Sequence, residues 1–142
     1  MSQNDETLLP VLIKRCARII DRQIDALLKK HGVARSQYRV MYHVAHGDEP
    51  TQKELQEKMG VQASTLTLMI DALVQKGWLI RVRDQQDKRH NKLQLSPAGK
   101  TLYRQIPEPA KKLDKSLREE LSKTEAKAYE KLLLRTIDKL NE

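Results

Sequence analysis

The sequence has little cysteine and no long apolar segment, and these two absences argue against several classes of protein. Cys16 is the only cysteine among 142 residues, so it can complete neither an internal disulfide nor a cysteine-based zinc site. The longest run without a charged residue, from Met59 to Ile70, has 12 residues. A membrane-spanning helix needs roughly 20 apolar residues. We therefore expect neither a disulfide-stapled scaffold nor a transmembrane protein.

The N-terminal residues lack the features of a secretory signal. Residues 1–6 are acidic, with no basic patch and no apolar core, so a cytoplasmic location is expected. The whole chain has a net charge of +8 and a pI near 9.6. Such an excess favours a polyanionic partner, although by itself it does not separate nucleic acid from a membrane surface or simple solubility.

The first half of the chain has the spacing of helices. Apolar residues recur at steps of three and four from Leu9 to Leu27, which predicts a long amphipathic helix. A second helix is expected around residues 38–45, before a break at 47–50. Thr51 and Glu54 form a capping box that starts a short helix ending near Met59.

A tight turn and another helix follow the short helix. Gly60 permits the turn, and Leu66, Ile70 and Leu73 predict the buried stripe of the next helix, which stops near Gly77. A short helix, a turn and a second helix are the order of a helix-turn-helix.

The helical period then changes to an alternation of apolar and polar residues at 78–83 and 92–95, which predicts two strands. The polar segment 84–90 between them is too long for a two-residue turn, so the hairpin carries a protruding loop.

Two further helices are predicted after the hairpin. Ser96 and Pro97 start the first of them, and Pro107 and Pro109 should bend or interrupt it. A second capping box at Ser122 starts the last helix. The chain is therefore expected to be mainly α, with a two-stranded hairpin among six helices.

The residues before and within the hairpin favour nucleic-acid binding. Residues 76–92 carry a net charge of +4, half of the excess. The helix before them begins with the small polar residues Ser64, Thr65 and Thr67, which can approach base edges and phosphates. A helix that enters the major groove beside a basic hairpin is the arrangement of a winged helix.

The sequence resembles the MarR family of winged helix-turn-helix transcriptional regulators over nearly its whole length. The resemblance is carried by 64–67 with Asp71, Leu73 and 76–77, then Arg81 or Arg83, the loop 84–89 and the segment 95–99. It implies one MarR-type domain over 1–142, with a DNA-binding lobe at about 36–100 and long terminal dimerisation helices at about 6–31 and 101–141.

The resemblance also implies residue roles. Arg89 would enter the minor groove, held in place by Asp87. Many members have basic residues where this chain has Leu68 and Ala72, so the preferred DNA sequence does not transfer. The residues expected to contact or position DNA are Thr51, Gln52, Gln62, Ser64, Thr65, Thr67, Leu68, Arg81, Arg83, Asp87, Lys88, Arg89 and Lys92.

The favoured function is a homodimeric repressor of a pseudo-palindromic operator, released by a small molecule or a stress signal. Wide apolar faces on the outer helices suit a two-fold dimer better than packing within one chain. A sequence-tolerant architectural DNA-binding protein is the alternative. An enzyme is disfavoured because the four histidines accompany no recognisable nucleophile, phosphate loop or zinc motif, and no cofactor is expected.

A few other residues allow two interpretations. Tyr38, Met41 and Tyr42 could line a small-molecule pocket, although a core role is favoured for each. Cys16 could be a redox switch, since Arg15 and Arg18 flank it, but a thiol on an apolar helix face is usually inert. His43 and His46 lie three residues apart without an identifiable third metal ligand, so structural or surface roles are favoured and no metal is expected.

Overall fold

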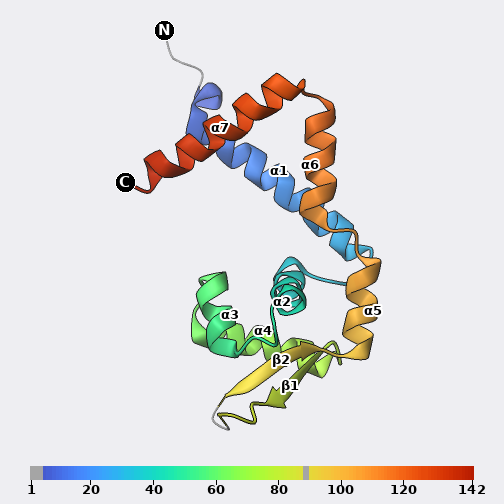
Figure 1. Cartoon of the computed structure of the whole chain (residues 1–142). Coiled ribbons are helices and arrows are strands. Elements are labelled where there is room, and N and C mark those ends of the chain that lie inside the picture. Colours follow the sequence, from blue (N-terminus) through green and yellow to red (C-terminus); the bar gives the residue numbers. More distant parts are fainter. Residues whose placement is uncertain (1–4, 88–89) are drawn as a thin grey trace. The chain divides into compact units, whose positions relative to one another are not determined.

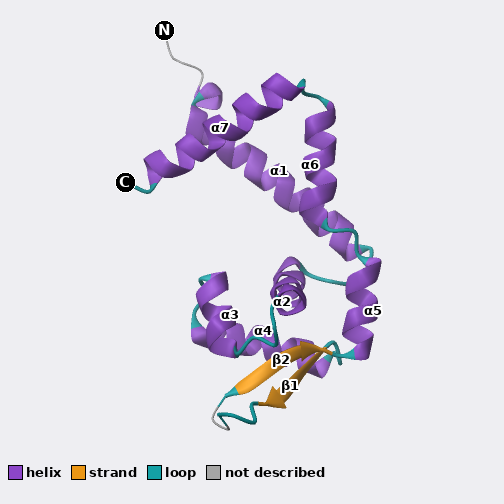
Figure 2. Cartoon of the chain, viewed as in Figure 1, coloured by secondary structure: helices purple, strands orange, loops and turns teal. Residues whose placement is uncertain are grey.

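A computed structural model of the chain describes residues 5–87 and 90–142, which are mainly helical with one two-stranded antiparallel sheet (Figure 1 and Figure 2). The chain divides into two compact units, one ending at Pro107 and the other beginning at Glu108. In the described ranges, no helix has the length and apolarity needed to cross a bilayer. The elements are a 3-10 helix Asp5–Thr7, α1 Leu9–Lys29, α2 Arg35–His46, α3 Gln52–Met59, α4 Ala63–Gln75, β1 Leu79–Arg83, β2 Asn91–Leu95, α5 Pro97–Gln105, α6 Pro109–Glu119 and α7 Lys123–Leu140.

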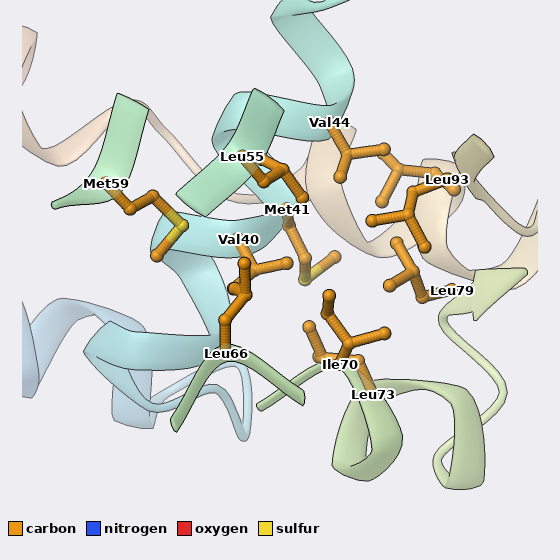
Figure 3. Close-up of a cluster of buried hydrophobic side chains, with 11 residues drawn as sticks. Val40, Met41, Val44, Leu55, Met59, Leu66, Ile70, Leu73, Leu79 and Leu93 are labelled. Atoms are coloured by element: carbon orange, nitrogen blue, oxygen red, sulfur yellow. The ribbon is translucent and has the colours of Figure 1, made fainter. Parts of the chain in front are cut away.

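The main core lies between α2, α3, α4 and the hairpin. Figure 3 shows its side chains, which point toward one another from all of these elements. The three residues expected to form the buried stripe of α4, Leu66, Ile70 and Leu73, are each 0% exposed. Because one side of α4 is fully buried, the opposite side must face solvent, and this fixes how the helix is presented.

The expected helix starts are present. The Thr51 hydroxyl accepts a hydrogen bond from the Glu54 amide at 3.2 Å, which is the threonine half of the predicted box. Gly60 ends α3 with φ of 63°, a left-handed conformation that glycine adopts without steric cost. At the start of α7, Ser122 and Glu125 form the complete reciprocal box.

The register of the hairpin places its buried and its exposed apolar residues on opposite faces of the sheet. Leu79 pairs with Leu95 and Arg81 with Leu93, so the buried leucines of both strands share the face that covers the core. Ile80 and Val82 lie on the other face and are partly exposed. On its outer edge, β2 is joined to the chain before α3, because the Leu93 amide donates to the Pro50 carbonyl at 2.9 Å.

The segment between the hairpin and α5 packs closely against the end of α4. Ser96 accepts a hydrogen bond from the Gly99 amide at 2.9 Å, and its hydroxyl donates to the Gly77 carbonyl. A Cβ at position 99 would lie 2.0 Å from the Trp78 carbonyl oxygen. Glycine is therefore required here by the close approach of the backbone.

A smaller core joins the C-terminal end of α1 to the elements of the main core. Leu28, Val33 and Ile106 are buried together, and Trp78 and Leu102 contact both this cluster and the main core. The expected break at the prolines is complete: α5 ends at Gln105 and α6 begins at Pro109.

Two leucines of α4 allow a matched test of this burial. Leu66→Ala should lower the free energy of unfolding by about 2–5 kcal/mol, because it removes a fully buried side chain and leaves a cavity. Leu68→Ala on the exposed side should change it by less than about 0.5 kcal/mol. Urea unfolding at one fixed protein concentration measures both, and equal losses would contradict the described orientation of α4.

Candidate nucleic-acid interface

The solvent-facing side of α4 is a neutral stripe with a leucine at its centre. Exposed residues follow one another at helical spacing along it, and Leu68 is 71% exposed. We call this surface the α4 stripe; it consists of Ser64, Thr65, Leu68, Asp71, Ala72 and Gln75. No lysine or arginine occurs in α4, so the stripe can approach another surface without long cationic side chains in between.

Two of the expected DNA contacts hold α3 and α4 together. The Gln52 side-chain amide donates to the Thr67 hydroxyl at 2.6 Å, and that hydroxyl donates to the Ala63 carbonyl at 3.0 Å. Gln62 occupies the N-cap position of α4 and makes no side-chain capping bond. Thr67 and Gln52 thus use polar atoms to join the two helices, whereas Ser64 and Thr65 lie exposed at the start of α4.

Arg81 is tied to α4 by an ion pair. Its guanidinium contacts the Asp71 carboxylate, which joins β1 to the α4 stripe. The pair also neutralises the only charged side chain of the stripe. Arg83 lies exposed two residues further along the same face of the hairpin, and Lys92, opposite Val82 in the register, lies on the other face.

The loop of the hairpin is closed by its own hydrogen bonds. The Asp84 amide donates to the His90 carbonyl at 3.1 Å, and the Gln86 amide donates to the Asp84 carboxylate at 3.0 Å. The Asp87 carboxylate lies 3.6 Å from the His90 imidazole, so these side chains attract each other when the histidine is protonated. The expected contacts Lys88 and Arg89 lie outside the described residues.

The three residues considered for a small-molecule pocket differ in burial. Met41 is 0% exposed in the main core. Tyr38 and Tyr42 are half-buried; the Tyr38 ring stacks on Tyr103 with centroids 5.8 Å apart, and the Tyr42 ring stacks on His46 at 4.2 Å. Tyr103 also lines an open groove of about 520 Å³ between the end of α2, β2 and α5.

The histidines of α2 belong to this aromatic cluster. Partial burial, reinforced by the positive charges of Arg39 and Lys58, lowers the pKa of His43. His46 places Nδ1 2.9 Å from the Tyr42 carbonyl, to which it donates a hydrogen bond. In the part of the chain that the structure describes, no group of three or more His, Cys, Asp or Glu side chains is placed to hold a metal ion. Cys16 is exposed on α1.

The pairing of Arg81 with Asp71 is a site feature that was not predicted from the sequence. From the sequence, Asp71 was expected only as part of the family resemblance, and Arg81 was expected to contact DNA directly. The two residues lie ten positions apart across a helix end and a turn, so no helical or strand periodicity links them.

Comparison with known proteins finds relatives among transcriptional regulators. The model of the MarR family matches residues 33–90. The multiple antibiotic resistance protein MarR of Salmonella typhimurium is 29% identical over 114 residues, which are 80% of this chain and 79% of that protein. An uncharacterised HTH-type transcriptional regulator of Bacillus subtilis, YwoH, is 28% identical over 120 residues, covering 84% of this chain and 87% of its own.

Solved structures give the same result. A cysteine-to-serine mutant of MarR from E. coli, crystallised with operator DNA, has 26% sequence identity and a TM-score of 0.78, and the match covers 95% of this chain and 99% of that one. These relatives are transcriptional regulators rather than enzymes. The family expected from the sequence is supported by all of these comparisons: the chain is similar to MarR-family regulators over most of its length, and its fold is the winged helix of the MarR structures.

Proposed function

We propose that this DNA-binding transcriptional regulator acts as a homodimeric repressor, which binds a pseudo-palindromic operator and releases it in response to a small molecule or a stress signal. The observation that carries the proposal is the α4 stripe, exposed beside the basic hairpin. Its relative MarR from E. coli has been crystallised with operator DNA.

The stripe and the hairpin would divide the work of recognition. Small hydroxyl side chains at the start of α4 can reach base edges in the major groove, and the free amides of the helix N-terminus attract phosphate. Cations of the hairpin supply the sequence-independent attraction to the DNA backbone. On this basis Ser64, Thr65 and Leu68 contact bases, Arg83, Lys88, Arg89 and Lys92 contact the backbone or the minor groove, and Gln52, Thr67, Arg81 and Asp87 position them.

The dimer is proposed from apolar faces that one chain leaves uncovered. On α1 the exposed fraction is 41% for Ile13 and 42% for Ile19, and on α7 it is 44% for Leu133 and 53% for Ile137. Exposed apolar residues that recur along one helix in this way usually mark an association site. A second copy is the occupant we propose, because a two-fold pair would repeat α4 about one DNA turn apart.

Release by a signal would follow from a shift between two arrangements of the dimer. One of the two arrangements cannot reach both half-sites. A molecule that binds this arrangement more tightly than the other lowers the affinity for DNA, at most by the ratio of its own affinities for the two arrangements. The half-buried tyrosines of α2 and the groove lined by Tyr103 lie in the lobe that carries α4, and we place the small molecule there.

Operator binding is tested by gel shift on the DNA flanking the protein's own gene, with excess unrelated duplex as competitor. The wild type should retain its site against the competitor, and Arg89→Ala should weaken binding about tenfold or more, because a groove-contacting arginine is lost. Lys127→Ala, which removes a cation from α7, is the matched control and should bind normally. Binding that any DNA displaces equally would favour the architectural alternative.

Self-association is tested by light scattering. The double change of Leu133→Lys and Ile137→Lys should convert the dimer into monomers, since two charges would be buried in an apolar interface. Asp138→Lys puts the same side chain about 100–140° away from these two positions around the axis of α7 and should leave the mass unchanged. A monomeric wild type would refute the dimer.

A further inference from the structure

We infer that Leu68 is a specificity-determining residue that reads thymine, packing its side chain against the C5-methyl group of a thymine in the major groove. The inference rests on the proposed function, and it adds a feature of the operator: a thymine in each half-site, opposite the middle of α4. It also explains how a recognition helix without cations can distinguish base pairs.

The exposure of Leu68 contrasts with that of its apolar neighbours in the helix. Leu66, Ile70 and Leu73 are each 0% exposed, whereas Leu68 is 71% exposed. Single exposed leucines are common on protein surfaces, so exposure alone would mean little. The exposure of Leu68 is informative because of its position, which is the centre of the face of α4 that the core leaves exposed.

The residues around Leu68 leave the methyl contact unobstructed. Ser64 and Thr65 lie one turn before it and Ala72 one turn after it, and all of these side chains are short and exposed. Leu68 is therefore the side chain that projects furthest from the middle of the stripe. A base contact in the centre of α4 would be made by its two methyl groups.

The electrostatics of the stripe agree with an apolar contact. Asp71 is the only charged residue in α4, and Arg81 pairs with it. The pair holds the carboxylate to β1 and offsets its repulsion of DNA phosphates. What remains around Leu68 is uncharged, so base discrimination there must come from shape and hydrogen-bond matching.

Thymine is the base that fits such a side chain. It alone presents a methyl group in the major groove, whereas cytosine and adenine present amino donors. A leucine placed over an amino group would leave that donor without a partner, at a cost in affinity. Covering the thymine methyl removes apolar surface from water and should strengthen binding about fourfold for one methyl group.

The experiment begins with selection of binding sites from a pool of DNA duplexes with a random central segment, using the full-length wild-type protein. Each thymine of the selected half-site is then replaced by deoxyuridine, which differs only in lacking the methyl group. Affinities are measured for the wild type, for Leu68→Ala and for Gln75→Ala, a matched control on the same stripe.

One thymine position should respond. Deoxyuridine there should weaken wild-type binding about fourfold, leave Leu68→Ala binding unchanged relative to thymine, and weaken Gln75→Ala as it does the wild type. Circular dichroism and the thermal midpoint show whether the variants fold as the wild type does. As a second variant, Leu68→Gln should shift selection at that position from thymine toward adenine, which glutamine recognises through two hydrogen bonds.

The outcomes separate the inference from the function on which it rests. If no sequence is enriched by the wild type, the proposed function fails and the inference with it. If a site is enriched but deoxyuridine has no effect at any position, or affects Leu68→Ala as much as the wild type, only the thymine contact is overturned. Unchanged selection by Leu68→Gln would also overturn it.

Discussion

The burial of Leu66, Ile70 and Leu73 in one core is the constraint on which the rest of the DNA-binding lobe depends. These side chains occupy one side of α4, and they share the core with residues of α2, α3 and both strands of the hairpin. A rotation of α4 about its axis would expose apolar surface on one side and bury Ser64 and Thr65 on the other. The core therefore determines which residues of α4 meet a partner.

Three kinds of contact attach the hairpin to the helices beside it. Leu79, Leu93 and Leu95 are buried in the main core, the Arg81 ion pair joins β1 to α4, and the hydrogen bond from Leu93 to Pro50 joins β2 to the start of α3. The cations of the hairpin are thus held near a helix that has none. Under the proposed function, such a division would assign the salt-dependent attraction to the hairpin and the choice of bases to α4.

The sequence predicted the helices, the hairpin and the buried stripe of α4, because each has a local signal in periodicity or capping. It did not predict which face of β1 is buried, since Ile80 and Val82 alternate as regularly as Leu79 and Arg81. The Arg81–Asp71 pair and the contact of Gly99 with the Trp78 backbone arise only when separate segments meet. For Met41 the sequence favoured a core role but left a pocket open, because nothing local distinguishes a core methionine from one that lines a pocket; the structure buries it in the main core.

Site-directed cleavage of bound DNA shows which helix lies against the duplex. Ala72→Cys, made in a Cys16→Ser background, carries an iron-EDTA group that cleaves DNA near its point of attachment, and Lys131→Cys carries the same group on α7. With a selected duplex, the label on α4 should cut two segments about one helical turn, or roughly 10 base pairs, apart, and the label on α7 should cut weakly. Strong cleavage from α7 with none from α4 would contradict the assignment of α4 as the recognition helix.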